Sequence, residues 1–460
     1  MILLISQAVI LLKLFEFRRI LQKNEKNHSI FNKVENFIFA PATKERYKIR
    51  QNAFTRNRKF PFELLILSLI NMPKRTMSIE LQSFFNYLRR GVGRIVSITT
   101  SAFTQSRQKL SPDVFVGING VVLDEYYTDN EERVTLWEGH RLLSIDGSYI
   151  CLPYSEELKE IYGTYNNQKK TEDVILGRAS VLYDVLNNIV IEGFLLPKSE
   201  GEITIAYDHV KQLQRNDLVI LDRGYPSFGL AYEILEKEAG FLFRCKHEYN
   251  NITKQFMKSD KQEDIVEIKC KQKQSFENKS YTKDSTIQVR LIKILLDSGE
   301  VELLMTSLID KEKYPHGCFK ALYFKRWGIE TYYDRLKNIL NVENFSGLTN
   351  QAILQDFQCA LFISNVQSLI IEEAQQSANE KYNKRRYEYK INTSVSLGFL
   401  KYRILDLFIN RGAKATLEEL EKILIEQVVP VRKNRKFIRE HDKYRQRLKP
   451  PMFKNRKRTI

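Results

Sequence analysis

The order of strand-like and helix-like runs between residues 141 and 246 restricts the fold most strongly. Three β-rich runs come first, followed by a helical pattern, a short apolar run, a second helical pattern and a final β-rich run. This order predicts an α/β domain built on one sheet. The expected strands are Arg141–Leu152, Ala179–Leu186, Ile189–Leu196, Leu218–Leu221 and Gly240–Lys246, and the expected helices are Ile203–Leu213 and Ser227–Ala239.

The net charge indicates the kind of partner. The 460 residues include 73 Lys and Arg against 56 Asp and Glu, a net charge of +17, and 43% of them are hydrophobic, which excludes wholesale disorder. A surplus of this size favours an anionic partner, nucleic acid first and an acidic membrane surface second. Residues 431–460 alone carry 13 Lys and Arg against 2 Asp and Glu. We interpret them as a basic arm that contacts the DNA backbone, with a solvated tail as the alternative.

The cysteines and the first residues bear on the cellular compartment. Five cysteines lie far apart, without a C-x-x-C pair or a Cys/His cluster, which argues against a disulfide framework and a structural zinc site. The apolar segment Met1–Phe15 lacks a basic start and a cleavage site, and it is shorter than the ~20 residues of a membrane helix. We therefore expect a cytoplasmic, nucleoid-associated protein that binds no membrane. A signal anchor is the alternative for this segment.

Helical runs precede the sheet. They cover Phe60–Ile70, Ser78–Leu88 and Thr100–Leu110, and the last of them carries Arg107 and Lys109. Small helices with interspersed basic residues suit a DNA-binding module, and a helical accessory bundle is an equal alternative.

Two aspartates follow apolar strands of the expected sheet. Asp146 comes after the first strand and precedes Gly147 and Ser148, and Asp222 comes after the Leu218–Leu221 strand. Carboxylates at the ends of interior strands lie at the sheet edge where ligands of open α/β sheets bind, and Mg²⁺ prefers such oxygen ligands. Taken singly, each aspartate is also a common turn or helix-cap residue.

The segment Phe319–Leu340 is expected to form one long helix with a chemically mixed face. Tyr323, Arg326, Glu330 and Lys337 fall within a 60° arc when each residue turns the helix by 100°. This face is either a solvated surface with an Arg326–Glu330 ion pair or a site with a third carboxylate among phosphate-binding groups. Spacing alone leaves both readings open.

The spacing Tyr323-x2-Arg326-x3-Glu330-x6-Lys337 resembles the Y-R-E-K signature of bacterial DDE transposases of the insertion-sequence-4 type. The family also places aspartates after the first and fourth strands of an RNase H-like core, as at Asp146 and Asp222. The resemblance spans roughly residues 55–430. It implies an α/β fold whose RNase H-like catalytic core is interrupted by a β-rich insertion, with helical N- and C-terminal regions.

The resemblance also implies a chemistry and a set of site residues. Asp146, Asp222 and Glu330 would be catalytic and would hold two Mg²⁺ ions, for which Mn²⁺ is the expected substitute. Water would cleave the DNA at the transposon end, and the freed 3′-OH would then attack target DNA. Tyr323, Arg326 and Lys337 would grip DNA phosphates. Arg223 is a weaker phosphate candidate, because only its adjacency to Asp222 supports it.

The resemblance further implies partners and a domain order. The partners are double-stranded DNA, as terminal inverted repeats and as target, and a second copy of the chain in a homodimer on DNA. The expected regions are 1–130 (helical, DNA-end binding), 131–246 (first part of the core), 247–308 (β-rich insertion), 309–375 (second part of the core, with the Y-R-E-K helix) and 376–460 (helical, with the basic tail). A catalytically silent DNA-binding relative and an RNase H-like nuclease without strand transfer are the competing interpretations of this cut-and-paste transposase.

Aromatic residues mark one departure from the family. Some members stack a flipped base on a tryptophan of the insertion, but the tryptophans of this chain, Trp137 and Trp327, both lie outside residues 247–308. We expect Trp327 to pack within the protein. Phe256, Phe276 and Tyr281 are the candidates in the insertion for base stacking, and nothing in the sequence selects among them.

Other signals are weaker. The histidines are scattered and predict no acid–base pair. The run Tyr382–Tyr389 mixes aromatic and basic residues, which fits either a DNA contact or a solvated loop.

Overall fold

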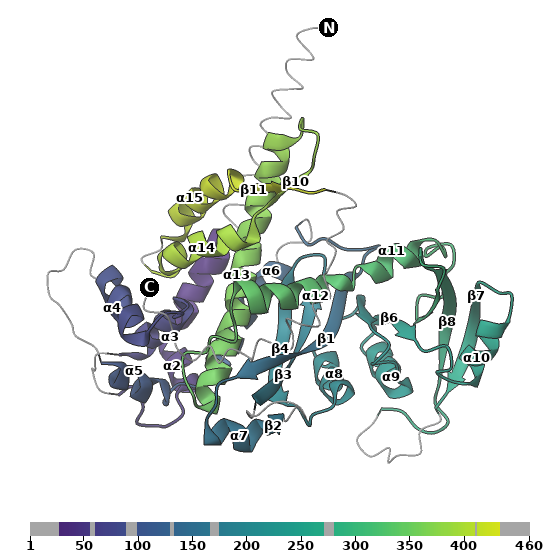
Figure 1. Cartoon of the computed structure of the whole chain (residues 1–460), viewed down its shortest axis with the longest axis horizontal. Coiled ribbons are helices and arrows are strands. Elements are labelled where there is room, and N and C mark those ends of the chain that lie inside the picture. The colour runs from purple at the N-terminus through teal and green to yellow at the C-terminus, as the bar shows by residue number, and fades with distance from the viewer. Residues whose placement is uncertain are drawn as a thin grey trace, which may run out of the picture.

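The computed structural model describes residues 27–55, 60–88, 99–128, 133–165, 174–270, 280–409 and 412–432. A central sheet separates a helical region, formed by both ends of the described chain, from a strand-rich region (Figure 1). The segment Met1–Phe15, the basic tail from residue 433 onward and Phe276 lie outside the described residues.

Five strands form the centre of the sheet. They are β1 (Arg141–Leu152), β3 (Val174–Asp184), β4 (Ile189–Pro197), β5 (Asp217–Leu221) and β6 (Gly240–Cys245). Their order is β4-β3-β1-β5-β6; β3 runs antiparallel to β1 and β4, whereas β5 and β6 run parallel to β1. This is the arrangement of an RNase H-like core, and it confirms the expected fold class and all five expected strands.

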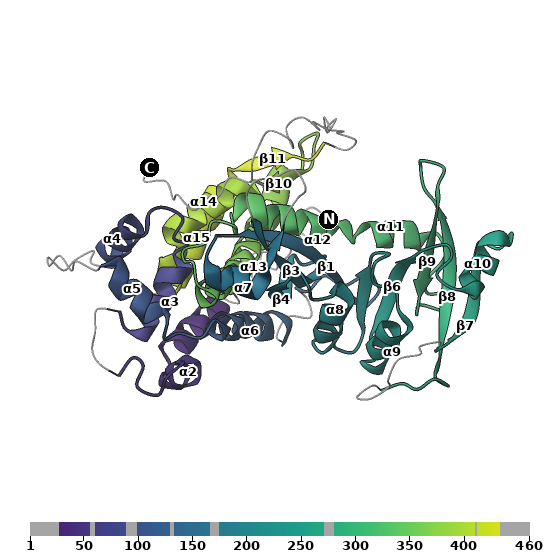
Figure 2. The same ribbon diagram turned by 60° about the horizontal axis from the view of Figure 1, so that its bottom comes forward.

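Helices cover both faces of this sheet. The crossover helices α8 (Glu202–Val210) and α9 (Phe228–Glu236) lie on one face, and α11 (Cys318–Phe324) and α12 (Trp327–Asp334) lie on the other (Figure 2). Successive side chains of β5 point to opposite faces of the sheet, which explains why both faces are apolar. Leu218 and Ile220 join the cluster that contains α11, whereas Val219 and Leu221 join the cluster that contains α9.

The strands expected between residues 247 and 308 are present and belong to the same sheet. After α10 (Asn251–Lys258), β7 (Glu263–Lys269), β8 (Thr286–Leu295) and β9 (Val301–Thr306) form an antiparallel meander. β9 pairs antiparallel with β6, so that Leu242 lies opposite Thr306. The insertion therefore extends the core sheet edge to edge.

The helical region is organised around α13 (Asn350–Tyr382), whose middle turns are buried. This helix packs against α6, α15 and β4. The elements around it are α2 (Pro41–Tyr47), α3 (Phe62–Ile70), α4 (Met77–Leu88), α5 (Thr100–Arg107), α6 (Asp113–Thr128), α7 (Glu156–Tyr162), β10 (Tyr389–Ile391), α14 (Thr393–Arg403), η2 (Ile404–Leu407), α15 (Ala413–Ile425) and β11 (Val428–Pro430). The short strand β2 (Thr164–Tyr165) belongs to the core sheet, where it pairs with β3. Within the described residues, no helix has both the length and the apolar character needed to cross a membrane.

Arg107 joins α5 to α13 inside the protein, which fits the helical-bundle alternative for this residue. Its side chain is 4% exposed. The guanidinium forms an ion pair with Asp356 and donates hydrogen bonds to Gln355 and, over 2.7 Å, to the carbonyl of Ala352. A buried arginine must be paired in this way, and α5 is thereby fixed to the central helix.

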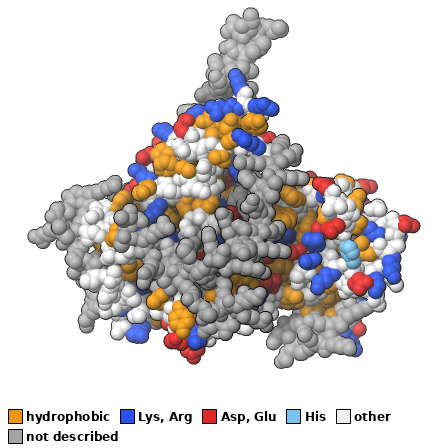
Figure 3. All heavy atoms as spheres, in the orientation of Figure 1, with side chains coloured by type: hydrophobic (Ala, Val, Ile, Leu, Met, Phe, Trp, Pro, Cys, Tyr) orange, Lys and Arg blue, Asp and Glu red, His pale blue; other side chains and the backbone are white. Residues whose placement is uncertain are grey.

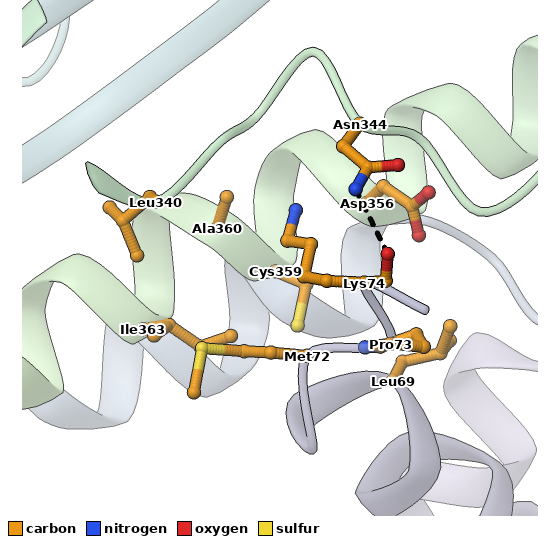
Figure 4. A pocket seen from close by; sticks show the side chains of 10 residues that line it. All are labelled: Leu69, Met72, Pro73, Lys74, Leu340, Asn344, Asp356, Cys359, Ala360 and Ile363. Carbon is orange, nitrogen blue, oxygen red and sulfur yellow. Dashed lines mark hydrogen bonds between the residues drawn. The ribbon is translucent and has the colours of Figure 1, made fainter. Parts of the chain in front are cut away.

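A second junction surrounds a small cavity of about 30 Å³ between the α3–α4 connection and α13 (Figure 4). Lys74 enters it beside Asp356 and Cys359, and its ammonium donates to the carbonyl of Asn341 at 3.0 Å. The Asn344 amide donates in return to the Lys74 carbonyl at 3.0 Å. Burial lowers the pKa of Lys74 to about 8.

Candidate active site

Asp146 and Asp222 lie level with one another on neighbouring parallel strands. Arg141 pairs with Asp217 and Ser144 with Ile220, so continuing this register places Asp146 opposite Asp222. β5 ends at Leu221, whereas β1 continues to Leu152. Asp146 therefore lies in the middle of its strand, and the expectation that it ends the strand is wrong. It nevertheless reaches the sheet edge, because its neighbour β5 stops there.

Protein donors hold both carboxylates. The Gly147 amide donates to Asp146 Oδ1 at 2.8 Å, and the Arg223 amide donates to Asp222 Oδ1 at 2.7 Å. The Tyr323 hydroxyl lies 3.4 Å from Asp222 Oδ1. Burial raises the pKa of Asp146 to about 6, although the Gly147 amide and the Arg326 guanidinium act in the opposite direction.

The expected helix Phe319–Leu340 is present as three shorter pieces. α11 ends at Phe324, α12 begins at Trp327, and η1 (Arg335–Ile339) is a turn of π-helix. At the first break the Arg326 amide donates to the Tyr323 carbonyl, three residues back, at 3.0 Å. The uniform 100° step that predicted a single 60° arc therefore does not apply across these breaks.

Arg326 connects Tyr323 with Glu330. The residue is 5% exposed, and its Nη2 donates to Glu330 Oε1 at 2.7 Å. Its guanidinium carbon lies 5.8 Å from the Tyr323 ring centre and 5.6 Å from the ring of Trp327. Glu330 keeps a 40% exposed side chain. The tyrosine, the arginine and the two carboxylates Asp222 and Glu330 thus form one connected group.

Lys337, in η1, contacts β1 beyond Asp146. Its ammonium donates to Ser148 Oγ at 2.7 Å, two residues beyond Asp146 on the same face of the strand. Arg223 has an exposed side chain and lines a cleft of about 540 Å³ with Arg244 and Lys246. The structure therefore brings the residues of the Y-R-E-K spacing to the face of β1 and β5 that carries the two aspartates, with Arg223 beside them.

Two tyrosines of this site were missed by the sequence interpretation. The Tyr333 hydroxyl donates to the carbonyl of Asp146 at 2.8 Å and thereby fixes α12 to β1. Tyr225 is 2% exposed, and its hydroxyl has no hydrogen-bond partner within the described residues. Both lie three residues after a proposed carboxylate, Glu330 and Asp222, which is the only signal that the sequence offered.

Two of the three aromatic candidates of the insertion, Phe256 and Tyr281, are not available for base stacking. Phe256 is 5% exposed and packs into the cluster that contains α9, and Tyr281 is 1% exposed and packs against Phe228 and Tyr232 of α9. Trp327, in contrast, is 50% exposed beside Arg326, and the expectation that it packs within the protein is wrong.

His209 has both ring nitrogens engaged in a buried arrangement with a serine and a glutamate that the sequence did not predict. His209 Nε2 lies 3.1 Å from Ser180 Oγ, and its Nδ1 lies 2.9 Å from Glu192 Oε2. The order resembles a hydrolase triad, but Ser180 is 1% exposed and His209 is fully buried. A substrate cannot reach this serine, so the three residues fasten α8 to β3 and β4.

The run Tyr382–Tyr389 forms a surface at the end of α13. Lys384, Arg385 and Arg386 are exposed, and the Arg385 guanidinium lies 4.3 Å from the ring centre of Tyr382. Figure 3 shows Lys and Arg side chains gathered at this upper end of the molecule. The surface position fits either expected role, DNA contact or solvated loop.

The three carboxylates are suitable ligands for a divalent cation. In this structure they accept hydrogen bonds from protein groups instead. In the described parts of the chain, no three His, Cys, Asp or Glu side chains are placed to enclose a metal ion as they stand. Asp146, Asp222 and Glu330 are nevertheless hard oxygen ligands on one face. The buried Nε of Arg326 has no hydrogen-bond partner among the described residues, so this site also keeps a donor suited to an anion such as a phosphate.

Comparisons with known proteins identify a family and relatives of this chain. The family model described as "Transposase DDE domain" matches residues 137–366, half of the chain. The transposase InsG for insertion sequence element IS4 of Escherichia coli (strain K12) is 21% identical over 290 residues, which are 62% of this chain and 63% of InsG. InsZ of the same organism is 22% identical over 189 residues, 40% of this chain and 61% of InsZ.

The chain thus spans about three fifths of the length of these relatives. Among solved structures, it is similar to the piggyBac transposase in a synaptic complex with hairpin DNA. The TM-score is 0.43 at 10% identity, over 90% of this chain and 88% of the other. With half of its residues matched by the family model, the chain belongs to the family of transposases with a DDE domain.

Proposed function

We propose that the protein cleaves double-stranded DNA at transposon ends and joins the freed ends to target DNA, in a cut-and-paste transposition that requires Mg²⁺. The level placement of Asp146 and Asp222, with Glu330 brought to the same face by α12, carries this proposal. These three residues are the proposed catalytic carboxylates and metal ligands. Mg²⁺ held by them, with Mn²⁺ as a substitute, would supply Lewis-acid stabilisation of charge on the reacting phosphate.

The neighbouring cations have roles that follow from their chemistry. Arg326 presents a planar fork that now binds Glu330 and would bind a phosphate when that carboxylate turns to a metal. Lys337 places a point charge two residues past Asp146. The Tyr323 hydroxyl, now 3.4 Å from Asp222, would donate to a phosphate oxygen. Arg223, exposed beside Asp222, would meet the DNA backbone further along the strand.

The raised pKa of Asp146 supports a role as ligand. A half-buried carboxylate with a pKa of about 6 has lost part of its hydration. The charge of a bound cation would compensate for that loss and stabilise the ionised form. The proposed partners are terminal inverted repeats and target DNA, and the proposed assembly is a homodimer on two paired ends. The net charge of +17 supports binding to the phosphate backbone, with a steep dependence on salt.

The test uses a DNA fragment that carries the ends flanking the gene. Purified protein with Mg²⁺ should nick the fragment at its outer boundary and then produce strand-transfer products. Asp146→Ala should lose both reactions, whereas Asp208→Ala, an exposed aspartate paired with Lys211 on α8, should retain them.

Other results would assign the chain differently. Tight binding without cleavage in Mg²⁺ or Mn²⁺ would identify a silent DNA-binding relative. Cleavage without joining would identify a nuclease on the same core.

A further inference from the structure

The connection between α13 and β10 concentrates positive charge on the surface of the protein. Residues 381–390, here called the α13–β10 surface, contain five Lys and Arg against one Glu. The side chains of Lys384, Arg385 and Arg386 are exposed. Tyr387, which follows them, is 39% exposed. The surface lies where α13 projects beyond the sheet, with β10 and β11 beside it (Figure 1), and the proposed active site uses none of these side chains.

Contacts within the protein hold this surface in shape. Gln375 of α13 donates to the carbonyl of Tyr389 at 2.7 Å and accepts from the amide of Ile391 at 2.8 Å. β11 pairs antiparallel with β10, and just beyond it the Val431 amide donates to the Glu388 carbonyl at 2.8 Å. A cleft of about 510 Å³ between the end of α13 and β10 is therefore bounded by fixed backbone.

Arg385 lines this cleft beside two aromatic rings. Its guanidinium carbon lies 4.3 Å from the ring centre of Tyr382 and 5.3 Å from that of Tyr389. Rings at these distances attract the planar cation and hold it in place. Within the described residues, no carboxylate lies within ion-pair distance of Arg385, and Glu426 at the end of α15 is paired with Lys381 instead. The fork of Arg385 is thus oriented and has no anionic partner in this part of the chain.

The side chains of this surface are of the kinds that contact nucleic-acid phosphates. Arginine and tyrosine are common phosphate contacts, and an arginine fork binds a phosphate by two parallel hydrogen bonds. The Arg386 guanidinium carbon lies 5.4 Å from the ring centre of Tyr387, so a second exposed cation stands beside a phenol. The sequence after residue 432 carries a surplus of Lys and Arg and therefore cannot neutralise this surface. The anion must come from another molecule.

The surface is remote from the proposed active site. α13 contacts α12 at Ser364, whose Oγ lies 3.4 Å from the Tyr332 hydroxyl. From Ser364 to Tyr382 the helix extends roughly 27 Å at about 1.5 Å per residue. This length corresponds to roughly eight base pairs of duplex. The α13–β10 surface would therefore bind a different stretch of DNA from the one that is cut.

We infer that the α13–β10 surface binds the phosphate backbone of double-stranded DNA at a place separate from the proposed active site, with Arg385 as a phosphate contact. This inference rests on the proposed function only in taking DNA as the partner, because binding here requires neither a metal ion nor cleavage. A contact of this kind adds affinity and orients the duplex without reading its sequence.

The experiment measures binding of the full chain to a fluorescently labelled duplex that carries an end flanking the gene. Anisotropy is recorded in EDTA at several salt concentrations, so that no cleavage occurs. Arg385→Gln should weaken binding by about fivefold at about 0.15 M salt and should lower the slope of log K against log salt by about 0.9, since one phosphate contact is lost. Lys237→Gln removes the same charge at an exposed position at the end of α9 and should leave both values unchanged.

A second variant covers the case in which Arg385→Gln disturbs the cleft. The double variant Lys384→Gln and Arg386→Gln leaves the contact of Arg385 with Tyr382 intact and should also weaken binding and lower the salt slope. Circular dichroism checks that every variant is folded.

Other results would overturn the inference. Wild-type affinity and salt slope in both surface variants would show that DNA does not bind here, while the proposed function would stand on its own cleavage test. Equal losses in Arg385→Gln and Lys237→Gln would show that only the total charge matters. Failure of the wild type to bind the duplex would contradict the DNA partner of the proposed function itself. Polyglutamate binding that is lost in Arg385→Gln would then assign the surface to an acidic peptide.

Discussion

Asp222 lies level with Asp146 because the parallel pairing of β5 with β1 sets Ile220 opposite Ser144, two residues earlier on each strand. The folded protein therefore keeps two carboxylates close together at the end of β5. Repulsion between these two negative charges costs stability, and burial adds a second cost, since it raises the pKa of Asp146 to about 6 from an ordinary value of 3.8. Such a cost is typical of sites where function and stability conflict.

Asp146→Asn should abolish cleavage and stabilise the protein. The raised pKa means that the folded state disfavours the ionised carboxyl, so wild-type stability falls as the pH rises from about 4 to about 6. Without metal at pH 7.5, the variant should gain about 1–2 kcal/mol in free energy of unfolding, after allowance for partial exposure. Urea unfolding at pH 4 and pH 7.5 checks this; an equal gain at both values would contradict the assigned cause.

Arg107→Met should destabilise the protein without a specific effect on DNA. The variant leaves Asp356 without its buried cation, and breaking a buried pair typically costs about 3–5 kcal/mol. Lys109→Met, on the same turn and only partly buried, should change the free energy of unfolding by less than about 0.5 kcal/mol. Weaker DNA binding by Arg107→Met with unchanged urea unfolding would restore the DNA-contact interpretation.

Lys74→Met should remove a pH dependence of stability. With its pKa lowered to about 8 from 10.5, the unfolded chain binds more protons than the folded chain between these values, so wild-type stability rises with pH across that window. At pH 7 the variant should therefore be more stable by about 1–3 kcal/mol, and the difference should shrink by pH 10. Lys384→Met, at an exposed position, should show no such trend. A difference independent of pH would contradict the assignment.

Arg326→Lys should impair cleavage more than stability. Lysine keeps the charge but lacks the planar fork that binds Glu330 beside Tyr323. We expect the cleavage rate to fall by about 100-fold, which corresponds to about 2.7 kcal/mol, with a smaller loss in free energy of unfolding. Rates at saturating DNA, measured beside urea unfolding, separate the two effects. An unchanged rate would remove the fork from the mechanism.

Much of the sheet was predictable because its strands are short apolar runs bounded by polar turns. Leu218–Leu221 was expected and lies within β5. The family resemblance, and not the spacing alone, predicted that Asp146, Asp222 and Glu330 lie together, and the structure brings them to one face; their catalytic role stays a prediction. The break at Arg326 was not predictable, because Arg326 is buried between Tyr323 and Glu330 only in the folded protein.

Other misses have the same origin. The sequence could not decide between the two readings of Arg107, because its partner Asp356 lies 249 residues away. Properties that depend on distant partners cannot be read from local spacing.

The pairing of β9 with β6 also fixes the outer strands relative to the core. An antiparallel pair cannot slip by one residue without turning its side chains to the opposite face. β7, β8 and β9 are therefore tied to β1 through an unbroken series of hydrogen-bonded neighbours. If DNA binds these outer strands, its distance from Asp146 is fixed by the sheet. The sheet would then set the number of base pairs between that contact and the proposed cleavage site.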